Sequence, residues 1–285
     1  MPWLLIENVP NMLALDRGQA MRYLVRELEQ LGYRWAYRTV DSRFTGSPQR
    51  RRRVLLVAST THDPREVLFA DDAGPRPDED YAEDAFGFYW TEGRGGLGWA
   101  RDAVPTLKGG STIGIPSPPA IWLPDASPGR TVVTPRISDA EAMQGFPREW
   151  TAIAEQGKAR SPRWKLVGNA VTVDVAAWVA GRLAAPGAVG VESREWDGPA
   201  SWPAAAWGQD GKVWSMPISE YPVRAPYRHL LDVVDADQAP ALSHRGVLGF
   251  IRRLEQGNLG RHPGFRTDMA EHADVIGPHM TPLAI

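Results

Sequence analysis

The first 60 residues combine apolar runs with one amphipathic stretch, a pattern that predicts part of an α/β domain. Residues 3–6 and 54–58 are continuous apolar runs of the length of buried strands, and residues 34–40 alternate as a third strand would. Between them, apolar residues recur at helical spacings of three and four: Met21, Leu24, Leu28 and Leu31. Gly32 follows as a helix stop. Strand, helix, strand and strand form half of an α/β domain rather than a whole one.

Residues 60–133 lose the helical period and gain glycine, proline and acidic residues. We therefore expect an irregular insertion of short strands and loops. Two stretches within it, 91–99 and 105–112, are rich in glycine. Such stretches can be ordinary turns, or they can be loops that must approach a ligand backbone closely. The pattern leaves both interpretations open.

Helical patterns return after residue 134. Ser138 followed by Glu141 has the form of a capping box with the serine as N-cap, and it predicts that a helix starts there. A second helix, beginning after residues 168–171 and ending before Pro186, is predicted from apolar residues at helical spacing: Val175, Trp178, Val179 and Leu183. Beyond residue 190 we expect one further helix, at 247–256.

The composition narrows the possible classes of protein. The 285-residue chain is 43% hydrophobic, enough for two or three compact units, and no apolar run reaches the ~20 residues of a membrane span. It contains no cysteine, which excludes disulfides, cysteine-ligated metals and a thiol nucleophile from this chain and favours a cytoplasmic protein. With a net charge of −2, nucleic-acid binding requires a local basic patch rather than an overall positive field.

Four consecutive arginines lead into the apolar run at 54–58. Because neighbouring side chains of a strand point to opposite faces, Arg51 and Arg53 should share one face, and Arg50 and Arg52 the other. Such a run is usually a solvated turn, but two guanidinium groups on one face also suit phosphate or carbonyl oxygens. Glu7, at the end of the first strand, is either an exposed carboxylate or a functional group beyond the carboxyl end of a strand.

Five short motifs between residues 7 and 171 resemble, in the same order, motifs of the DNA (cytosine-5) methyltransferase family. They are Glu7-Asn8-Val9, which resembles ENV; Gln49-x-Arg51-x-Arg53, which resembles QxRxR; Thr106-Leu107; residues 136–147, which end in Gln-Gly-Phe-Pro; and Gly168-Asn169-Ala170-Val171. The resemblance implies an α/β fold: the C-terminal part of a Rossmann-like methyltransferase sheet, with an inserted small β/loop target-recognition domain and a C-terminal extension.

Two features of that family are absent from this sequence: the glycine-bearing loop that holds most of S-adenosylmethionine, and the Pro-Cys motif whose thiolate attacks the base. The chain therefore resembles the C-terminal half of an enzyme split into two chains. This implies a partner subunit that carries the cofactor loop and the Pro-Cys motif, double-stranded DNA as substrate, and no membrane. An alternative is a non-catalytic DNA-binding or regulatory protein, and a further one makes RNA the substrate.

The resemblance also assigns roles to residues in the active site. Glu7 would hold ring nitrogen 3 of a flipped cytosine and Arg53 would face oxygen 2, while Arg51 would be structural or contact a phosphate. Asn169 and Val171 would close the S-adenosylmethionine pocket, most of which the partner would supply.

Contacts with DNA are expected from two places. In the insertion, the candidates are Arg94, Thr106 and Lys108, and around the arginine run they are Arg43, Gln49 and Arg50. We therefore divide the chain into a partial catalytic domain (1–59), a target-recognition domain (60–133), helices on the cofactor side (134–188) and an extension of unknown role (189–285). We expect a methyltransferase subunit of a restriction or phage-defence system.

Overall fold

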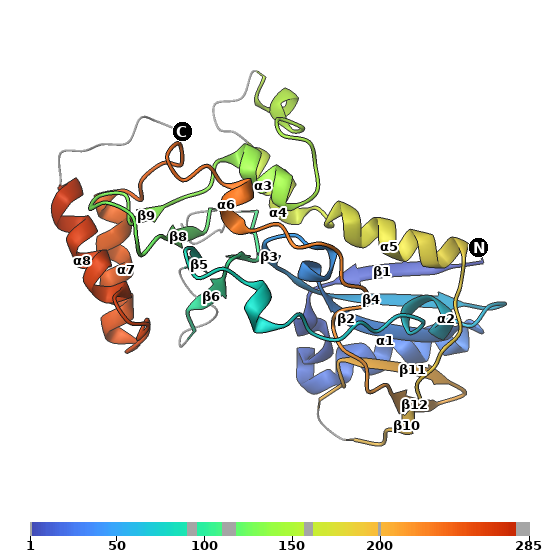
Figure 1. Ribbon diagram of the computed structural model, residues 1–285. Coiled ribbons are helices and arrows are strands. Elements are labelled where there is room, and N and C mark those ends of the chain that lie inside the picture. The colour runs from blue at the N-terminus through green and yellow to red at the C-terminus, as the bar shows by residue number, and fades with distance from the viewer. Residues whose placement is uncertain (1, 90–95, 110–117, 157–161, 199–200, 278–285) are drawn as a thin grey trace. The chain divides into compact units, whose positions relative to one another are not determined.

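The computed structural model describes residues 2–89, 96–109, 118–156, 162–198 and 201–277 (Figure 1). The chain divides into two compact units, each assembled from three segments. Unit 1 comprises Met1–Gly46, Arg51–Pro77 and Val171–Pro226, and unit 2 comprises Ser47–Arg50, Asp78–Ala170 and Tyr227–Ile285. The segment after residue 189 therefore contributes to both units. The functional division into four domains stays a prediction.

A six-stranded antiparallel sheet forms the centre of unit 1. Its strands, in spatial order, are β1 (Leu4–Asn8), β4 (Arg52–Ser59), β2 (Arg34–Asp41), β11 (Ala205–Gln209), β12 (Lys212–Ser215) and β10 (Arg194–Glu195). Because β1 and β2 both pair antiparallel with β4, they run parallel to each other on its two sides. The carboxyl end of β1 and the start of β4 therefore lie side by side.

Both faces of this sheet are buried, which explains why the sequence of β4 is continuously apolar. Leu55 and Val57 belong to one hydrophobic cluster, whereas Val54, Leu56 and Ala58 belong to another. The helices of unit 1 are α1 (Gln19–Gln30), which buries its apolar side in the second cluster, and α2 (Arg65–Leu68) and α5 (Val173–Ala184), which pack in the first. Short 3₁₀ helices span Pro10–Leu13, Leu15–Gly18 and Ser42–Thr45. Figure 1 shows α1 and α5 on opposite sides of the sheet.

The elements predicted for residues 3–58 and for the helix after residue 171 are confirmed, and so is the α/β class. One detail differs at the end of α1. Leu31 is 70% exposed because the helix ends at Gln30 and the chain turns at Gly32, whose φ is +82°. Val25, rather than Leu31, completes the buried stripe of α1.

Unit 2 contains two small sheets and five helices in its described residues. The strands are β3 (Gln49–Arg50) and β7 (Val104–Pro105), which pair in parallel, and β6 (Gly98–Arg101), β5 (Phe86–Tyr89), β8 (Ala120–Trp122) and β9 (Val132–Val133), in that spatial order. The helices are α3 (Ile137–Met143), α4 (Arg163–Asn169), α6 (Leu230–Val233), α7 (His244–Gln256) and α8 (Phe265–Ile276), with 3₁₀ turns at Asp78–Asp80 and Ala152–Glu155.

The short strands expected in the insertion are confirmed, and the start of the next helix needs a correction. Helix α3 begins at Ile137, and the backbone N–H of Arg136 donates to Oδ2 of Asp139 at 2.9 Å. Ser138 is therefore not the N-cap. Glu141 points inwards, where it forms a buried ion pair with Arg163 at 3.0 Å.

One segment, Arg163–Ala184, has the length and apolar composition of a membrane span, although only 28% of its most apolar window is buried. In the structure it consists of α4 and α5, which are separated by non-helical residues at 170–172. The exposed residues of α5 include three alanines: Ala176, Ala177 and Ala180.

Candidate active site

The register of the unit 1 sheet brings Glu7 and Arg53 together. Glu7 on β1 lies opposite Leu55 on β4. Arg53 precedes Leu55 by two residues, so its side chain lies on the same face of the sheet as those of Leu55 and Glu7. The carboxyl-terminal end of one strand and the start of its neighbour thus meet at one corner of the sheet.

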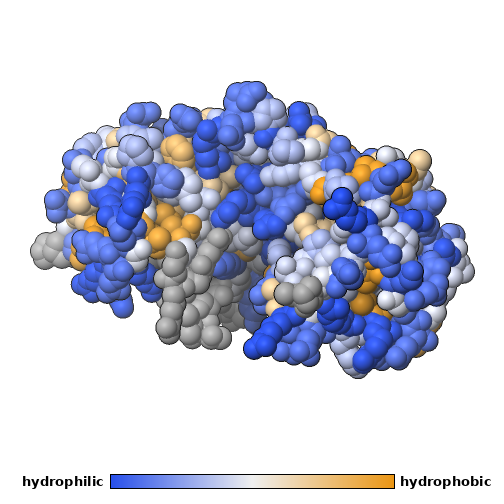
Figure 2. Space-filling view, turned by 90° about the horizontal axis from the view of Figure 1, so that it is seen from below, coloured by the Kyte–Doolittle hydropathy of each residue, from blue (hydrophilic) through white to orange (hydrophobic). Residues whose placement is uncertain are grey.

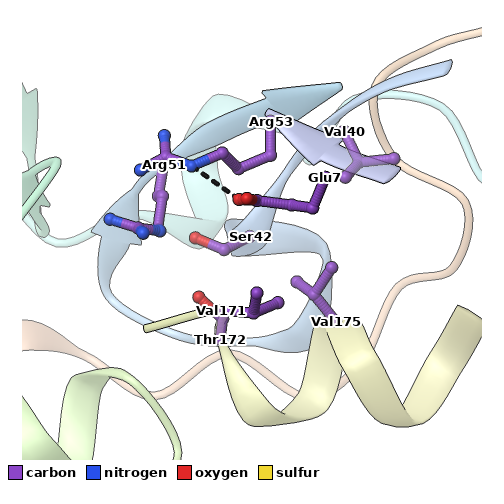
Figure 3. A pocket seen from close by; sticks show the side chains of 8 residues that line it. All are labelled: Glu7, Val40, Ser42, Arg51, Arg53, Val171, Thr172 and Val175. Carbon is purple, nitrogen blue, oxygen red and sulfur yellow. Dashed lines mark ion pairs between the residues drawn. The ribbon is translucent and has the colours of Figure 1, made fainter. Parts of the chain in front are cut away.

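Glu7 and Arg53 form an ion pair, with Nε of Arg53 2.8 Å from Oε1 of Glu7 (Figure 3). The two side chains are 26% and 14% exposed, and Nη1 of Arg53 also donates to the carbonyl of Arg52 at 2.8 Å. Burial lowers the pKa of Arg53, and the negative charge of Glu7 opposes that decrease. The pair is therefore fixed in place and shielded from most of the solvent.

Arg51 lies in the break between β3 and β4, where it is only 3% exposed and lines the same pocket. Burial lowers its pKa to about 9, and the adjacent charge of Arg53 adds to the decrease. Arg52 lies elsewhere, since its guanidinium pairs with Glu220, with Nε 2.7 Å from Oε2. The predicted sharing of one side by Arg51 and Arg53 is confirmed.

The remaining wall of the pocket comes from the end of β2, the 3₁₀ helix that follows it, and the chain at the start of α5. Val40 and Ser42 lie on one side, and Val171, Thr172 and Val175 lie on the other, as Figure 3 shows. The cavity among these side chains has a volume of about 10 Å³, room for about one water molecule. Ser42 and Thr172 could not be identified from the sequence, because Ser42 belongs to no motif and Thr172 only follows the motif at 168–171.

This arrangement can act on a planar, polar group. A carboxyl group and a guanidinium side by side can hydrogen-bond two neighbouring atoms on one edge of a heteroaromatic ring. Because the site is shielded from water, such hydrogen bonds stabilise developing charge more strongly than they would in solution. The described residues contain no cluster of histidine, aspartate and glutamate that could hold a metal ion.

The two predicted cofactor residues lie in different units. Val171 belongs to unit 1, lines the pocket and is 37% exposed. Asn169 is exposed at the last position of α4 in unit 2. The neighbouring Gly168 packs against the chain at residues 108–109, because a Cβ at this position would be 2.3 Å from the backbone of Lys108 and Gly109. Their roles at the cofactor stay predictions.

The prediction that Gln49 contacts DNA needs a correction, because its side chain is completely buried inside unit 2. Its Nε2 donates to Oε1 of Gln144 at 3.1 Å, and its Oε1 accepts the backbone N–H of Leu107 at 3.2 Å. Gln144 in turn donates to the carbonyl of Val167 at 2.8 Å. Gln49 therefore links three of the motifs to one another.

The other predicted DNA contacts occupy varied environments. Arg43 pairs with Asp41 at 2.8 Å, and Thr106 donates its hydroxyl hydrogen to the carbonyl of Arg50 at 3.0 Å. Nζ of Lys108 lies 4.3 Å from the centre of the Tyr89 ring. Arg94 lies outside the described residues. Contacts of Arg43, Arg50, Arg94, Thr106 and Lys108 with DNA stay predictions.

Comparisons with known proteins agree with this site. Residues 2–84, which include Glu7, Arg51 and Arg53, match the family model described as C-5 cytosine-specific DNA methylase. The chain is 46% identical over 266 residues to Type II methyltransferase M2.BsuMI of Bacillus subtilis, an alignment that covers 88% of this chain and 66% of that protein. It is 24% identical over 200 residues to Type II methyltransferase M.MspI of Moraxella sp, covering 64% of this chain and 46% of that protein.

The chain thus spans less than two thirds of the length of these two relatives. Among solved structures, the Dnmt2 methyltransferase of S. pombe matches with a TM-score of 0.43 and 15% identity, over 64% of each chain. The family match includes the pocket residues on β1 and β4. The chain belongs to the C-5 cytosine-specific DNA methylase family.

Proposed function

We propose that this chain is one subunit of a two-chain DNA cytosine-5 methyltransferase. It supplies target recognition and part of the active site, and a partner chain supplies the thiolate nucleophile. The observation that carries this proposal is the contact between Glu7 and Arg53, 2.8 Å apart at the wall of a shared pocket. The number in the name M2.BsuMI accords with an enzyme of more than one methyltransferase chain.

The pair suits the electronic demand of the reaction. A stacked cytosine is out of reach, so the enzyme must first flip it out of the duplex, which costs a few kcal/mol. When a thiolate attacks carbon 6, negative charge develops on ring nitrogen 3 and oxygen 2. The Glu7 carboxyl group would hydrogen-bond to nitrogen 3 and Arg53 would donate to oxygen 2, so both contacts strengthen in the transition state.

The small size of the pocket means that its side chains must move before a base can enter. A cavity of about 10 Å³ is too small for a base, and the guanidinium of Arg53 is held by Glu7. The side chains must therefore separate as the base enters, and the edge of the ring then replaces part of their mutual contact. Arg51, with a pKa of about 9, remains charged at neutral pH and keeps the pocket attractive to groups with partial negative charge.

S-adenosylmethionine would supply the methyl group, and the partner would bind most of it. Val171 suits a contact with such a cofactor, because it presents exposed apolar surface at the rim of the pocket, directly before α5. The exposed amide of Asn169 offers both a donor and an acceptor.

The free edge of the unit 1 sheet supports the assignment of a partner. Strand β1 is the terminal strand of the sheet, and its Leu5 is 42% exposed. An unpaired strand edge with exposed apolar side chains is a favourable site for another chain to dock. The lack of cysteine in this chain requires that the nucleophile come from elsewhere.

The test is transfer of labelled methyl groups from S-adenosylmethionine to duplex DNA by this chain together with the product of the neighbouring gene. Glu7→Gln and Arg53→Ala should each lower the rate by about 10²–10³-fold, since each removes a group that stabilises developing charge. The matched control is Arg52→Ala, which removes a neighbouring arginine that pairs with Glu220 instead. Its rate should stay close to that of the wild type.

Two results would contradict the proposal. Full activity of the Glu7 and Arg53 variants would show that these residues do not have the assigned roles. Methylation by this chain alone would show that no partner chain is needed. Salt-dependent DNA binding by the purified pair of chains, without any methyl transfer, would instead support a non-catalytic DNA-binding protein.

A further inference from the structure

Helix α7 carries a concentration of positive charge that the proposed active site does not use. Residues 244–266 contain five arginines and one glutamate, whereas the whole chain has a net charge of −2. The arginines of this stretch that lie on α7 are exposed: Arg245, Arg252 and Arg253. On the neighbouring helix α8 the exposed residues are Arg266 at its start and Glu271 and Asp274 further along, among others, so the positive charge gathers on α7 and the first turn of α8.

The geometry of α7 places two of these arginines on the face opposite the core. Val247, Phe250 and Leu254 are buried in the hydrophobic cluster of α7 and α8. Arg245 and Arg252 are seven residues apart, which corresponds to about two turns and roughly 10 Å along the axis. Gly249 and Gln256 fall on the same side, so the outer face of α7 consists of Arg245, Gly249, Arg252 and Gln256.

The two arginines are available to a ligand. Among the described residues, neither Arg245 nor Arg252 forms an ion pair or a hydrogen bond. Many other arginines of the chain are engaged by carboxylates, for example Arg38 with Asp72 and Arg163 with Glu141. A guanidinium binds phosphate oxygens through two parallel hydrogen bonds, so a face with two free arginines is suited to a polyphosphate surface.

The sequence of α7 is not the one that would best stabilise a helix. Arg245 lies in the first turn, where positive charge opposes the helix dipole, and that turn contains no acidic residue. Gly246 and Gly249 lie inside the helix, where glycine is unfavourable. An anionic ligand along this face would compensate the unfavourable position of Arg245. The small Gly249 on the same face would let the backbone of such a ligand come close.

We propose that the outer face of α7 binds the phosphate backbone of duplex DNA. This inference rests on the proposed function, because duplex DNA is taken as the substrate. A membrane surface suits the helix less well, because a membrane-bound amphipathic helix must insert its apolar side, and the apolar side of α7 is buried in unit 2. On the surface of unit 2, Figure 2 shows hydrophilic residues around a small hydrophobic patch.

The test compares the full-length chain with the double variant Arg245→Ala/Arg252→Ala, using a short fluorescent DNA duplex and anisotropy at several salt concentrations. Loss of two phosphate contacts should reduce the slope of log K against log salt by about 1.8. The loss of affinity should therefore be about ten times greater at 50 mM than at 200 mM salt. Conversely, Gln256→Lys, which adds a charge to the same face, should tighten binding and steepen the slope.

The matched control is Arg26→Ala/Lys212→Ala, which removes two exposed positive charges in unit 1 and changes the net charge equally. The control should keep the wild-type slope. An unchanged slope in the α7 variant, an equal decrease in the control, or a loss of binding to phosphatidylglycerol vesicles but not to DNA would each overturn the inference.

The outcome is separable from that of the proposed function. If the two-chain enzyme methylates DNA but the α7 variant keeps the wild-type salt slope, the inference fails and the methyltransferase proposal stands. If the slope decreases as expected but no methyl transfer occurs, the DNA-binding face is supported and the catalytic proposal fails.

Discussion

Replacing Glu7 by glutamine tests the pair at the centre of the site without any partner or substrate. The change keeps the shape of the side chain and removes its charge. Arg53 and Arg51 then remain close together, 14% and 3% exposed, without the one carboxylate that lines their pocket. Burial already lowers the pKa of both arginines, which shows that their charges are poorly solvated.

The magnitude follows from the separation of the charges. Two unit charges about 4 Å apart interact by about 4 kcal/mol at an effective dielectric constant of about 20. Partial exposure of Glu7 and Arg53 weakens this attraction, so we expect a coupling energy of about 2 kcal/mol between them. Glu7→Gln should lower the free energy of unfolding by about 3 kcal/mol, because it also leaves buried positive charge uncompensated.

The assay is urea unfolding followed by the fluorescence of the 12 tryptophans, in a double-mutant cycle with Arg53→Met. Arg53→Met removes one of the two crowded cations and should cost less than Glu7→Gln. In the double variant the cost should be well below the sum of the two single changes. A coupling energy below about 0.5 kcal/mol would refute the reasoning, since it would mean that solvent screens the pair almost completely.

Three further predictions concern other parts of the chain. Gly168→Ala should destabilise unit 2 by about 1–3 kcal/mol in urea unfolding, because the added Cβ would lie 2.3 Å from the backbone at Gly109; an unchanged midpoint would contradict the close packing. Glu141→Gln should cost about 2 kcal/mol near neutral pH, since it removes the buried partner of Arg163 and leaves the exposed Glu149 and Glu155. Burial alone would raise the pKa of Glu141, but its hydrogen bonds lower it, so this cost should shrink as pH falls below about 4.5; a cost independent of pH would exclude this explanation. The hydrogen bond of His229 to a buried aspartate raises the pKa of the imidazole above 6.5, so the pair should stabilise the fold most below pH 6.5 and lose that effect as pH rises through the raised value; NMR titration of wild type and unfolding of His229→Gln at several pH values test both statements.

The elements of unit 1 could be predicted because its strands are covered on both faces. Burial on both sides makes β4 continuously apolar, and α1 shows a clear amphipathic period. Strand β11 could not be predicted in this way, because Ala205-Ala206-Trp207-Gly208 has weak strand propensity and extends by pairing with β2 and β12. Gly208 is needed there, since a Cβ would lie 2.2 Å from the ring of Trp35.

Helix α8 was also missed, because its buried residues include His272 and Ala273 beside larger apolar ones. His272 can be buried because both of its ring nitrogens form hydrogen bonds. Its Nε2 donates to the carbonyl of Leu242 at 3.1 Å, and its Nδ1 accepts the N–H of Val132 at 3.3 Å. Such partners come from distant parts of the chain. The local hydrophobic pattern of α8 is therefore too weak to predict the helix.

The charged residues of the candidate site could be predicted from the sequence, but some of the other residues that line the pocket could not. Glu7, Arg51, Arg53 and Val171, all of which belong to motifs, line one pocket, whereas Ser42 lies in a 3₁₀ helix without a motif. The extended strand is interrupted at Arg51, between β3 and β4, which lies within the arginine motif. Its first residue, Gln49, consequently belongs to the interior of unit 2, and no alternation rule could indicate that.

The division of each unit among three chain segments has a consequence for engineering and for evolution. A chimera that exchanged only residues 60–133 with a relative would cut through the core of unit 2, which also draws on 137–143, 163–169 and 230–276. Exchange of the whole of unit 2 therefore requires three segments, 47–50, 78–170 and 227–285, to be replaced together rather than a single cassette. For the same reason, recombination that replaced one of these segments alone would leave the core of unit 2 mismatched.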